Sequence, residues 1–296
     1  MRGDGKTKAM WLGLVLTLGA CGGGGGGGAS EATHEDTTAS SEQPAPSSGD
    51  EQPAEAPAAP AAAPPRMRLV HASADANVGA ISASIDSAEP FASGIGYATA
   101  SPYVAVASGR HNVYVRGAED ESGMAPTLGL ASDVLEDEHA YTVFFVTQGS
   151  ADAPFALYTG DDDDSPGDES AAIRFFHALE GVDDVDVCTP GSGRGAGTAL
   201  FADVARNALG TANGLRYTDL PAGESATVQV RQHSSTVCSG RVIGVAHFTA
   251  AAGTSYTAVA IGRSGGRGRG ASPQLLVCRD APAGDGGCET VALAAR

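Results

Sequence analysis

The chain contains the same pattern of residues twice, and this internal repeat constrains its architecture more than any other feature. The stretch RLVHASADANVGAISASID around His71 aligns with IRFFHALEGVDDVDVCTPG around His177, and EDEHAYTVFFVTQGS around Tyr141 aligns with AAGTSYTAVAIGRSG around Tyr256. The offset is 106 residues at the histidines and 115 at the tyrosines, so the second copy carries extra residues, which fall in the glycine-rich stretch TPGSGRGAGT. We therefore expect two similar units in tandem.

Within each copy, apolar residues alternate with polar ones, which is the pattern of half-buried β-strands. Val113 and Val115 alternate with Asn112 and Tyr114, whereas residues 142–145 are apolar on nearly both faces, as in a central strand. Turn-forming stretches such as PAGE and AAGTS interrupt the strands at short intervals. About six or seven short strands per copy, without a convincing helical pattern, predict an all-β protein made of two antiparallel β-sandwiches.

The first twenty residues have the pattern of a secretory signal peptide. Arg2, Lys6 and Lys8 form a basic start, and the apolar run MWLGLVLTL is too short to span a bilayer as a mature helix. The run ends in LGAC, in which two small residues directly precede Cys21. This stretch resembles the lipobox of bacterial lipoproteins, and the resemblance implies cleavage before Cys21, acylation of that cysteine and anchoring to the outer membrane.

The remaining chain divides by composition. Residues 21–65 begin with seven glycines after the cysteine and continue with Ser, Glu, Thr, Ala and Pro, which cannot bury a core, so they predict a disordered tether. We expect a signal peptide at residues 1–20, the tether, a first β-sandwich at residues 66–160 and a second at residues 171–280. A C-terminal tail with a short disulfide loop is expected at residues 281–296.

The chain is strongly acidic, with a formal net charge of −17. Removal of residues 1–20 deletes three basic residues and one acidic residue, which leaves a charge of about −19. Because such a surface repels phosphate groups, nucleic acid is excluded as a partner. The expected partners are the membrane, through the lipid anchor, and an envelope polysaccharide or protein.

Four cysteines follow the lipobox cysteine, namely Cys188, Cys238, Cys278 and Cys288. An even number of cysteines in an exported protein indicates two disulfides, for which three pairings exist. We favour Cys278 with Cys288, which closes a short loop, and Cys188 with Cys238. A metal site is the alternative, but its usual CxxC spacing does not occur in the sequence.

Several motifs of the two copies resemble a bacterial family, the domain of unknown function numbered 4397. The first copy has His-Ala-Ser-x-Asp-Ala at residues 71–76, and the second has an aspartate-containing strand at 185–187, Leu-Pro-Ala-Gly at 220–223 and Gly-Thr-x-Tyr-Thr at 253–257. The resemblance spans residues 66 to about 280 and implies tandem immunoglobulin-like β-sandwiches in secreted or cell-surface proteins. The first copy lacks the Leu-Pro-Ala-Gly turn, and the second has Leu-Glu in place of Ser-x. The resemblance implies no catalytic residues and no cofactor.

His71 and His177 occupy the same place in the two copies, at the expected end of the first strand. A catalytic histidine requires a nucleophile to deprotonate or an acid that orients it, and no nucleophile recurs beside either residue. We expect each imidazole to close a turn through hydrogen bonds to the backbone. Contact with a ligand and catalysis are the less favoured alternatives.

Two further motifs have weak functional interpretations. An acidic run lies between the copies and could bind calcium, but Pro166 stands where a helix-flanked calcium loop needs glycine, so a solvated linker is favoured. The stretch GRSGG at residues 262–266 fits the nucleophile-elbow pattern, yet the glycines and arginines after it cannot form the helix that an elbow requires. The weak calcium candidates are Asp161, Asp162, Asp163 and Asp164.

These features together predict a cell-envelope lipoprotein that is not an enzyme. The leading hypothesis is a non-catalytic binding or adhesion protein of unknown ligand, anchored to the outer membrane. A structural spacer of the envelope is the main alternative, because tandem sandwiches serve that role equally well. A hydrolase of unrecognised type is the least favoured, because no catalytic set is evident in the sequence.

Overall fold

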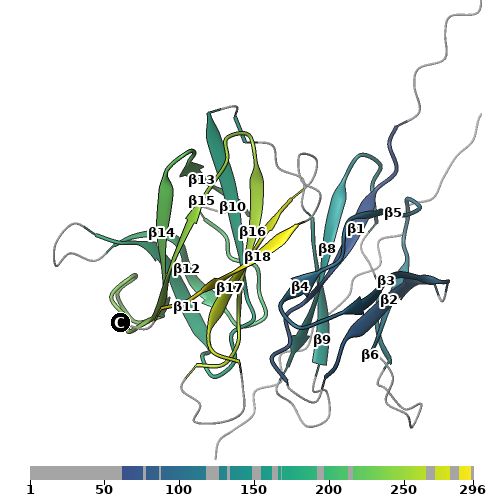
Figure 1. Cartoon of the computed structure of the whole chain (residues 1–296), viewed down its shortest axis with the longest axis horizontal. Helices are drawn as coiled ribbons and strands as arrows, with labels where there is room; N and C mark the ends of the chain where they lie inside the picture. Colours follow the sequence, from purple (N-terminus) through teal and green to yellow (C-terminus); the bar gives the residue numbers. More distant parts are fainter. Residues whose placement is uncertain are drawn as a thin grey trace, which may run out of the picture. The chain divides into compact units, whose positions relative to one another are not determined.

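Every regular element of the computed structural model is a β-strand, among the residues that the structure describes (Figure 1). These strands form four sheets. The described residues are 62–75, 78–86, 88–117, 127–131, 134–148, 155–161, 166–167, 169–191, 197–212, 216–264, 271–280 and 287–294. All of them belong to one unit, Ala59–Arg296. The predicted all-β fold is therefore confirmed.

The first sandwich consists of strands β1 to β9, coloured from blue to teal in Figure 1. Its strands are β1 (Arg66–His71), β2 (Ile81–Ile85), β3 (Pro90–Ile95), β4 (Thr99–Ala100), β5 (Val104–Ala105), β6 (Asn112–Gly117), β7 (Thr127–Ala131), β8 (Ala140–Thr147) and β9 (Phe155–Asp161). One sheet has the order β4-β1-β8-β9, with β5 also paired to β1, and the other has the order β3-β2-β6-β7.

The second sandwich repeats this strand order. Its strands are β10 (Ser170–His177), β11 (Asp184–Thr189), β12 (Thr198–Ala205), β13 (Thr218–Pro221), β14 (Ser225–Gln232), β15 (Val242–Thr249), β16 (Ser255–Ile261), β17 (Gln274–Arg279) and β18 (Cys288–Ala292). One sheet has the order β13-β10-β16-β17-β18, and the other has the order β12-β11-β14-β15. The strands β1, β2, β6 and β8 thus correspond to β10, β11, β14 and β16.

Each sandwich has its own core, which forms because alternate residues of each strand point to one face of the sheet. In the first sandwich, Leu69, Val113 and Val143 are fully buried between the two sheets. In the second, Phe175 and Val230 occupy the corresponding space. The alternating pattern in the sequence therefore identifies the residues that face these two cores.

One strand pairing in each sandwich differs from the predicted antiparallel arrangement. Strand β1 pairs with β8 in parallel, and β10 pairs with β16 in parallel, whereas the other ladders are antiparallel. Antiparallel neighbours are usually joined by a short hairpin, but β1 and β8 are separated in the chain by the strands β2 to β7. No hairpin turn sets their relative direction, so the sequence pattern alone could not reveal it.

The two sandwiches contact each other through the outer faces of their β1/β8 and β10/β16 sheets. The rings of Phe144 and Phe176 stack there, with centroids 4.2 Å apart and planes inclined by 4°. We call this contact the seam. Its buried residues are Val70, Ala72, Phe144, Val146, Phe176, Ala178, Val259, Ile261, Leu276 and Cys278. Residues 142–145 are apolar on nearly both faces because one face meets the first core and the other meets the seam.

The described residues 287–294 of the expected C-terminal tail are part of the second sandwich, which corrects the expected domain boundary. Strand β18 pairs with β17 from Cys278↔Cys288 to Gln274↔Ala292, and Ala294 then exchanges backbone hydrogen bonds with Val245. The pairing with β17 is antiparallel, so β18 forms an additional strand of this sheet.

The expected signal peptide, Cys21 and almost all of the tether lie outside the described residues. Within the part of the chain that the structure describes, no helix is long and apolar enough to cross a membrane.

Candidate functional site

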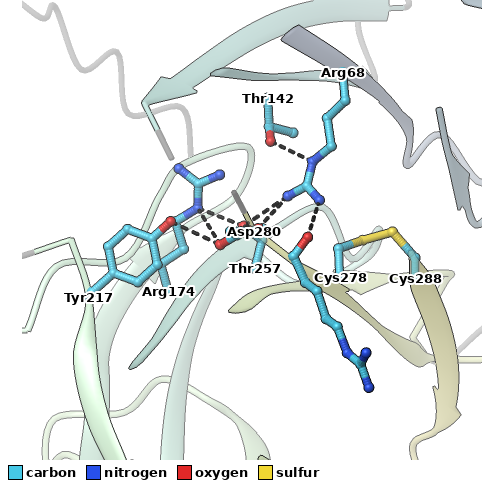
Figure 2. A network of polar contacts seen from close by, with 9 residues as sticks. Arg68, Thr142, Arg174, Tyr217, Thr257, Cys278, Asp280 and Cys288 are labelled. Carbon is cyan, nitrogen blue, oxygen red and sulfur yellow. Dashed lines mark hydrogen bonds and ion pairs between the residues drawn. A yellow bond between two sulfur atoms is a disulfide. The ribbon is translucent and has the colours of Figure 1, made fainter. Parts of the chain in front are cut away.

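A buried polar cluster lies in the seam around Arg68 of β1 (Figure 2). Its guanidinium group donates hydrogen bonds from Nε to Thr142 Oγ1 at 2.8 Å and from Nη1 to the backbone oxygen of Arg279 at 2.8 Å. It also forms an ion pair with the carboxylate of Asp280. Arg68 and Thr142 belong to the first sandwich, whereas Arg279 and Asp280 belong to the second, so these contacts cross the seam.

Asp280 collects further donors from its own sandwich. The hydroxyl groups of Tyr217 and Thr257 donate to the carboxylate at 2.9 and 2.8 Å. Arg174 Nε donates to Thr257 Oγ1 at 2.7 Å and lies 4.0 Å from the carboxylate. Each carboxylate oxygen is therefore hydrogen bonded, which offsets much of the cost of burying the charge.

Aromatic rings complete the surroundings of the two guanidinium groups. The guanidinium carbon of Arg68 lies 4.6 Å from the ring centroid of Tyr103, and that of Arg174 lies 5.4 Å from the centroid of Tyr217. Such cation–π contacts are worth more when water is excluded. We infer that the cluster is a structural lock, because the side chains of Arg68, Arg174 and Asp280 are all fully buried and offer a ligand no access.

The strand patterns and motifs did not predict this cluster, although the repeat contains a signal for it. An arginine stands three residues before the histidine in both copies, at Arg68 and Arg174. An arginine inside an otherwise apolar strand requires a buried partner, since such a residue is seldom fully buried alone. Its recurrence could have indicated that the outer face of this strand is covered.

His71 and His177 lie where the sequence placed them, at the ends of β1 and β10. Their side chains are fully buried, and each makes one backbone hydrogen bond. His71 Nε2 lies 3.2 Å from the backbone oxygen of Gly79, and His177 Nδ1 accepts from the N–H of Leu179 at 3.2 Å. The other ring nitrogen of each histidine has no hydrogen-bond partner. Burial lowers the pKa of His71, and it lowers the pKa of His177 to about 4.

The buried neutral His177 predicts a loss of stability in mild acid. Its pKa is about 4 in the folded protein, below the 6.5 of the unfolded chain, so the unfolded chain binds more protons between these values. The contribution is fully present above pH 6.5, falls as the pH decreases and is lost below about pH 4. Two and a half pKa units correspond to about 3 kcal/mol. Denaturant unfolding at a series of pH values measures this effect.

The variant His177→Gln should show a flatter stability profile between pH 6.5 and 4 than the unchanged protein. The matched control is His247→Gln, because His247 is exposed on β15 and is hydrogen bonded to the Thr227 hydroxyl. This control should keep the original profile. Equal pH dependence in the two variants would contradict the role of His177.

A second buried carboxylate, Asp186 of β11, holds the loop between β14 and β15. It accepts hydrogen bonds from the N–H groups of Asp203 and Cys238, each at 2.9 Å, and from His233 Nδ1 at 2.8 Å. Burial acts to raise the pKa of Asp186, but these three hydrogen bonds outweigh burial and lower the pKa overall. The Asp186 carboxylate in turn raises the pKa of His233.

Two disulfides reinforce these contacts. Cys188 is bonded to Cys238 and ties the same loop to β11, while Cys278 is bonded to Cys288 and joins β17 to β18. Both are the pairs that the sequence favoured. Disulfides of this kind are typical of proteins that fold outside the cytoplasm.

The other sequence motifs do not form a catalytic or metal site in the described part of the chain. Arg263, in the motif resembling a nucleophile elbow, forms an ion pair with Glu180, and residues 262–264 contain no helix. Asp161 is the last residue of β9, whereas Asp162, Asp163 and Asp164 lie outside the described residues. Among those residues that are described, no group of three acidic, histidine or cysteine side chains could hold a metal ion.

A comparison with protein families gives one match. Residues 65–188 match the family model described as a domain of unknown function, DUF4397. The matched stretch contains the whole first sandwich, strand β10 and all but the last residue of β11. No curated protein matches the chain. The DUF4397 match supports the family that the motifs resembled, and it adds no activity.

Proposed function

We propose that the protein is a lipid-anchored envelope protein whose two sandwiches act as one rigid, non-catalytic binding body. The observation that carries this proposal is the seam, in which the buried Arg68–Asp280 ion pair and the stacked Phe144 and Phe176 rings join the sandwiches. A rigid body displays its surface loops in one relative arrangement, which lowers the entropic cost of binding. The buried side chains of Arg68, Arg174 and Asp280 are engaged in contacts within the protein, and this supports a binding function rather than a catalytic one.

The binding proposal is tested with the exported chain purified in detergent. We expect saturable binding when it is titrated against isolated envelope polysaccharide, peptidoglycan and intact cells. The structural spacer is the alternative, favoured by the same rigid seam. A spacer would bind none of these fractions while remaining folded, and its function would depend on the length of the tether.

The lipid anchor is tested by replacing Cys21. The variant Cys21→Ala cannot be acylated on sulfur, so nearly all of the protein should move from the membrane fraction to the soluble fraction after cell lysis. Fractionation and immunoblotting measure the distribution. The control Gly22→Ala keeps the cysteine and should remain in the membrane fraction. Retention of Cys21→Ala in the membrane would contradict lipid anchoring through this residue.

A further inference from the structure

The outer face of the β3-β2-β6-β7 sheet carries a cavity that takes part in neither the seam nor the disulfides. Its volume is about 270 Å³, and the polar side chains lining it belong to Ser82, Ser84, Glu89 and Arg116. Ser82 and Ser84 face outward because Ile81, Ala83 and Ile85, which alternate with them along β2, contact the first core. The exposed Glu89 and Arg116 lie where the cavity meets solvent.

The polar groups of this cavity are available to a ligand. Ser84 is only 7% exposed. Among the residues that the structure describes, its hydroxyl group has no hydrogen-bond partner, and neither the Glu89 carboxylate nor the Arg116 guanidinium has one. Ser82 Oγ accepts only a long bond of 3.4 Å from the N–H of Gly94. A concave site with several unengaged polar groups converging on it is typical of a small-molecule site.

The outer face of β11 and β14 in the second sandwich corresponds to the face of β2 and β6 that carries the cavity. The register of β2 with β6 and of β11 with β14 makes Ser82 equivalent to Asp186 and Ser84 equivalent to Cys188. In the second sandwich this face is covered by polypeptide, because Cys238 is bonded to Cys188 and donates its N–H to Asp186.

The equivalent arginines of the two sandwiches, Arg116 and Arg231, also differ in their contacts. Arg231 is the equivalent of Arg116, and it donates to the backbone oxygen of Gly240 and to the side chain of Gln229. The second sandwich therefore uses this face to bind a segment of its own chain. In the same place the first sandwich has a cavity lined by Ser82, Ser84, Glu89 and Arg116.

We propose that this cavity binds a small zwitterion, of the size of a dipeptide with free amino and carboxyl ends. The Arg116 guanidinium and the serine hydroxyl groups are donors suited to a carboxylate, and the Glu89 carboxylate is an acceptor suited to an ammonium group. The volume equals that of about nine water molecules in the liquid, which limits the ligand to a small molecule. The inference rests on the proposed binding function and names a site for it.

The test is calorimetric titration of the exported chain in detergent with alanyl-alanine, with its N-acetyl derivative and with its C-terminal amide. Alanyl-alanine should bind saturably, the amide should lose most of the affinity, and the acetylated form should be weakened. Arg116→Gln should weaken alanyl-alanine binding by roughly 10- to 100-fold, as expected for a lost charged hydrogen bond. Glu89→Gln should weaken alanyl-alanine but leave its N-acetyl derivative unchanged.

The matched control is Arg110→Gln, because Arg110 is an exposed arginine outside the cavity and should leave binding unchanged. Equal loss in Arg110→Gln and Arg116→Gln, or binding of inorganic phosphate as tight as that of alanyl-alanine, would overturn the proposed zwitterion site. The absence of alanyl-alanine binding would also overturn it, and retained binding to envelope fractions would then show that the broader function stands. Loss of envelope binding with retained alanyl-alanine binding would instead uphold the site and contradict the broader proposal.

Discussion

Replacing Asp280 by asparagine is expected to lower the free energy of unfolding by about 3–5 kcal/mol. The change removes the negative charge that faces the buried guanidinium groups of Arg68 and Arg174, while the side-chain volume stays nearly the same. A buried charge that loses its counter-charge cannot recover the free energy of hydration that it gave up on folding. Equilibrium denaturation followed by circular dichroism measures the loss.

The matched control for this prediction is Asp219→Asn. Asp219 is exposed on β13 of the same sandwich, and its replacement should change the free energy of unfolding by less than about 0.5 kcal/mol. Because Asp280 joins the sandwiches, we also expect the unchanged protein to unfold in one transition and Asp280→Asn to unfold in two. A loss no larger than that of the control would show that the ion pair does not stabilise the seam.

Replacing Cys188 and Cys238 together by alanine is expected to lower the free energy of unfolding by about 4 kcal/mol. The disulfide closes a loop with a sequence separation of 50 residues, and its loss increases the conformational entropy of the unfolded chain. The loop that carries Cys238 would also be held less firmly against Asp186, so the pKa of His233 should fall toward its ordinary value. Denaturation and a proton NMR titration of His233 measure the two effects.

The control for the disulfide is Val237→Ala. Val237 is adjacent to Cys238 but is 42% exposed, so its truncation should cost less than about 0.5 kcal/mol and leave His233 unchanged. If the double alanine variant lost less than about 1 kcal/mol, or if the pKa of His233 remained raised, the disulfide would not be the element that holds this loop.

The sequence predicted those parts of the candidate sites that depend on local pattern. The repeat placed His71 and His177 at equivalent strand ends, and the number and spacing of the cysteines favoured the pairs that are present. It did not predict that Asp186 binds the Cys238 loop, since the two residues meet only after β14 and β15 have formed a hairpin. Nor did it predict the cavity beside Ser84, which depends on the fold of β2, β3 and β6.

The sequence by itself determined that the chain forms strands and which residues face each core. The alternation of apolar residues predicts which residues face a core, because successive side chains of a strand point to opposite faces. Only the tertiary structure decided what covers the outer faces of β1 and β8, that these strands are parallel, and that β18 completes a sheet. Arg68 and Asp280 are 212 residues apart in the chain, and their burial depends on how two complete sandwiches pack. Local residue patterns can indicate that Arg68 needs a buried partner, but they do not identify a partner over that separation.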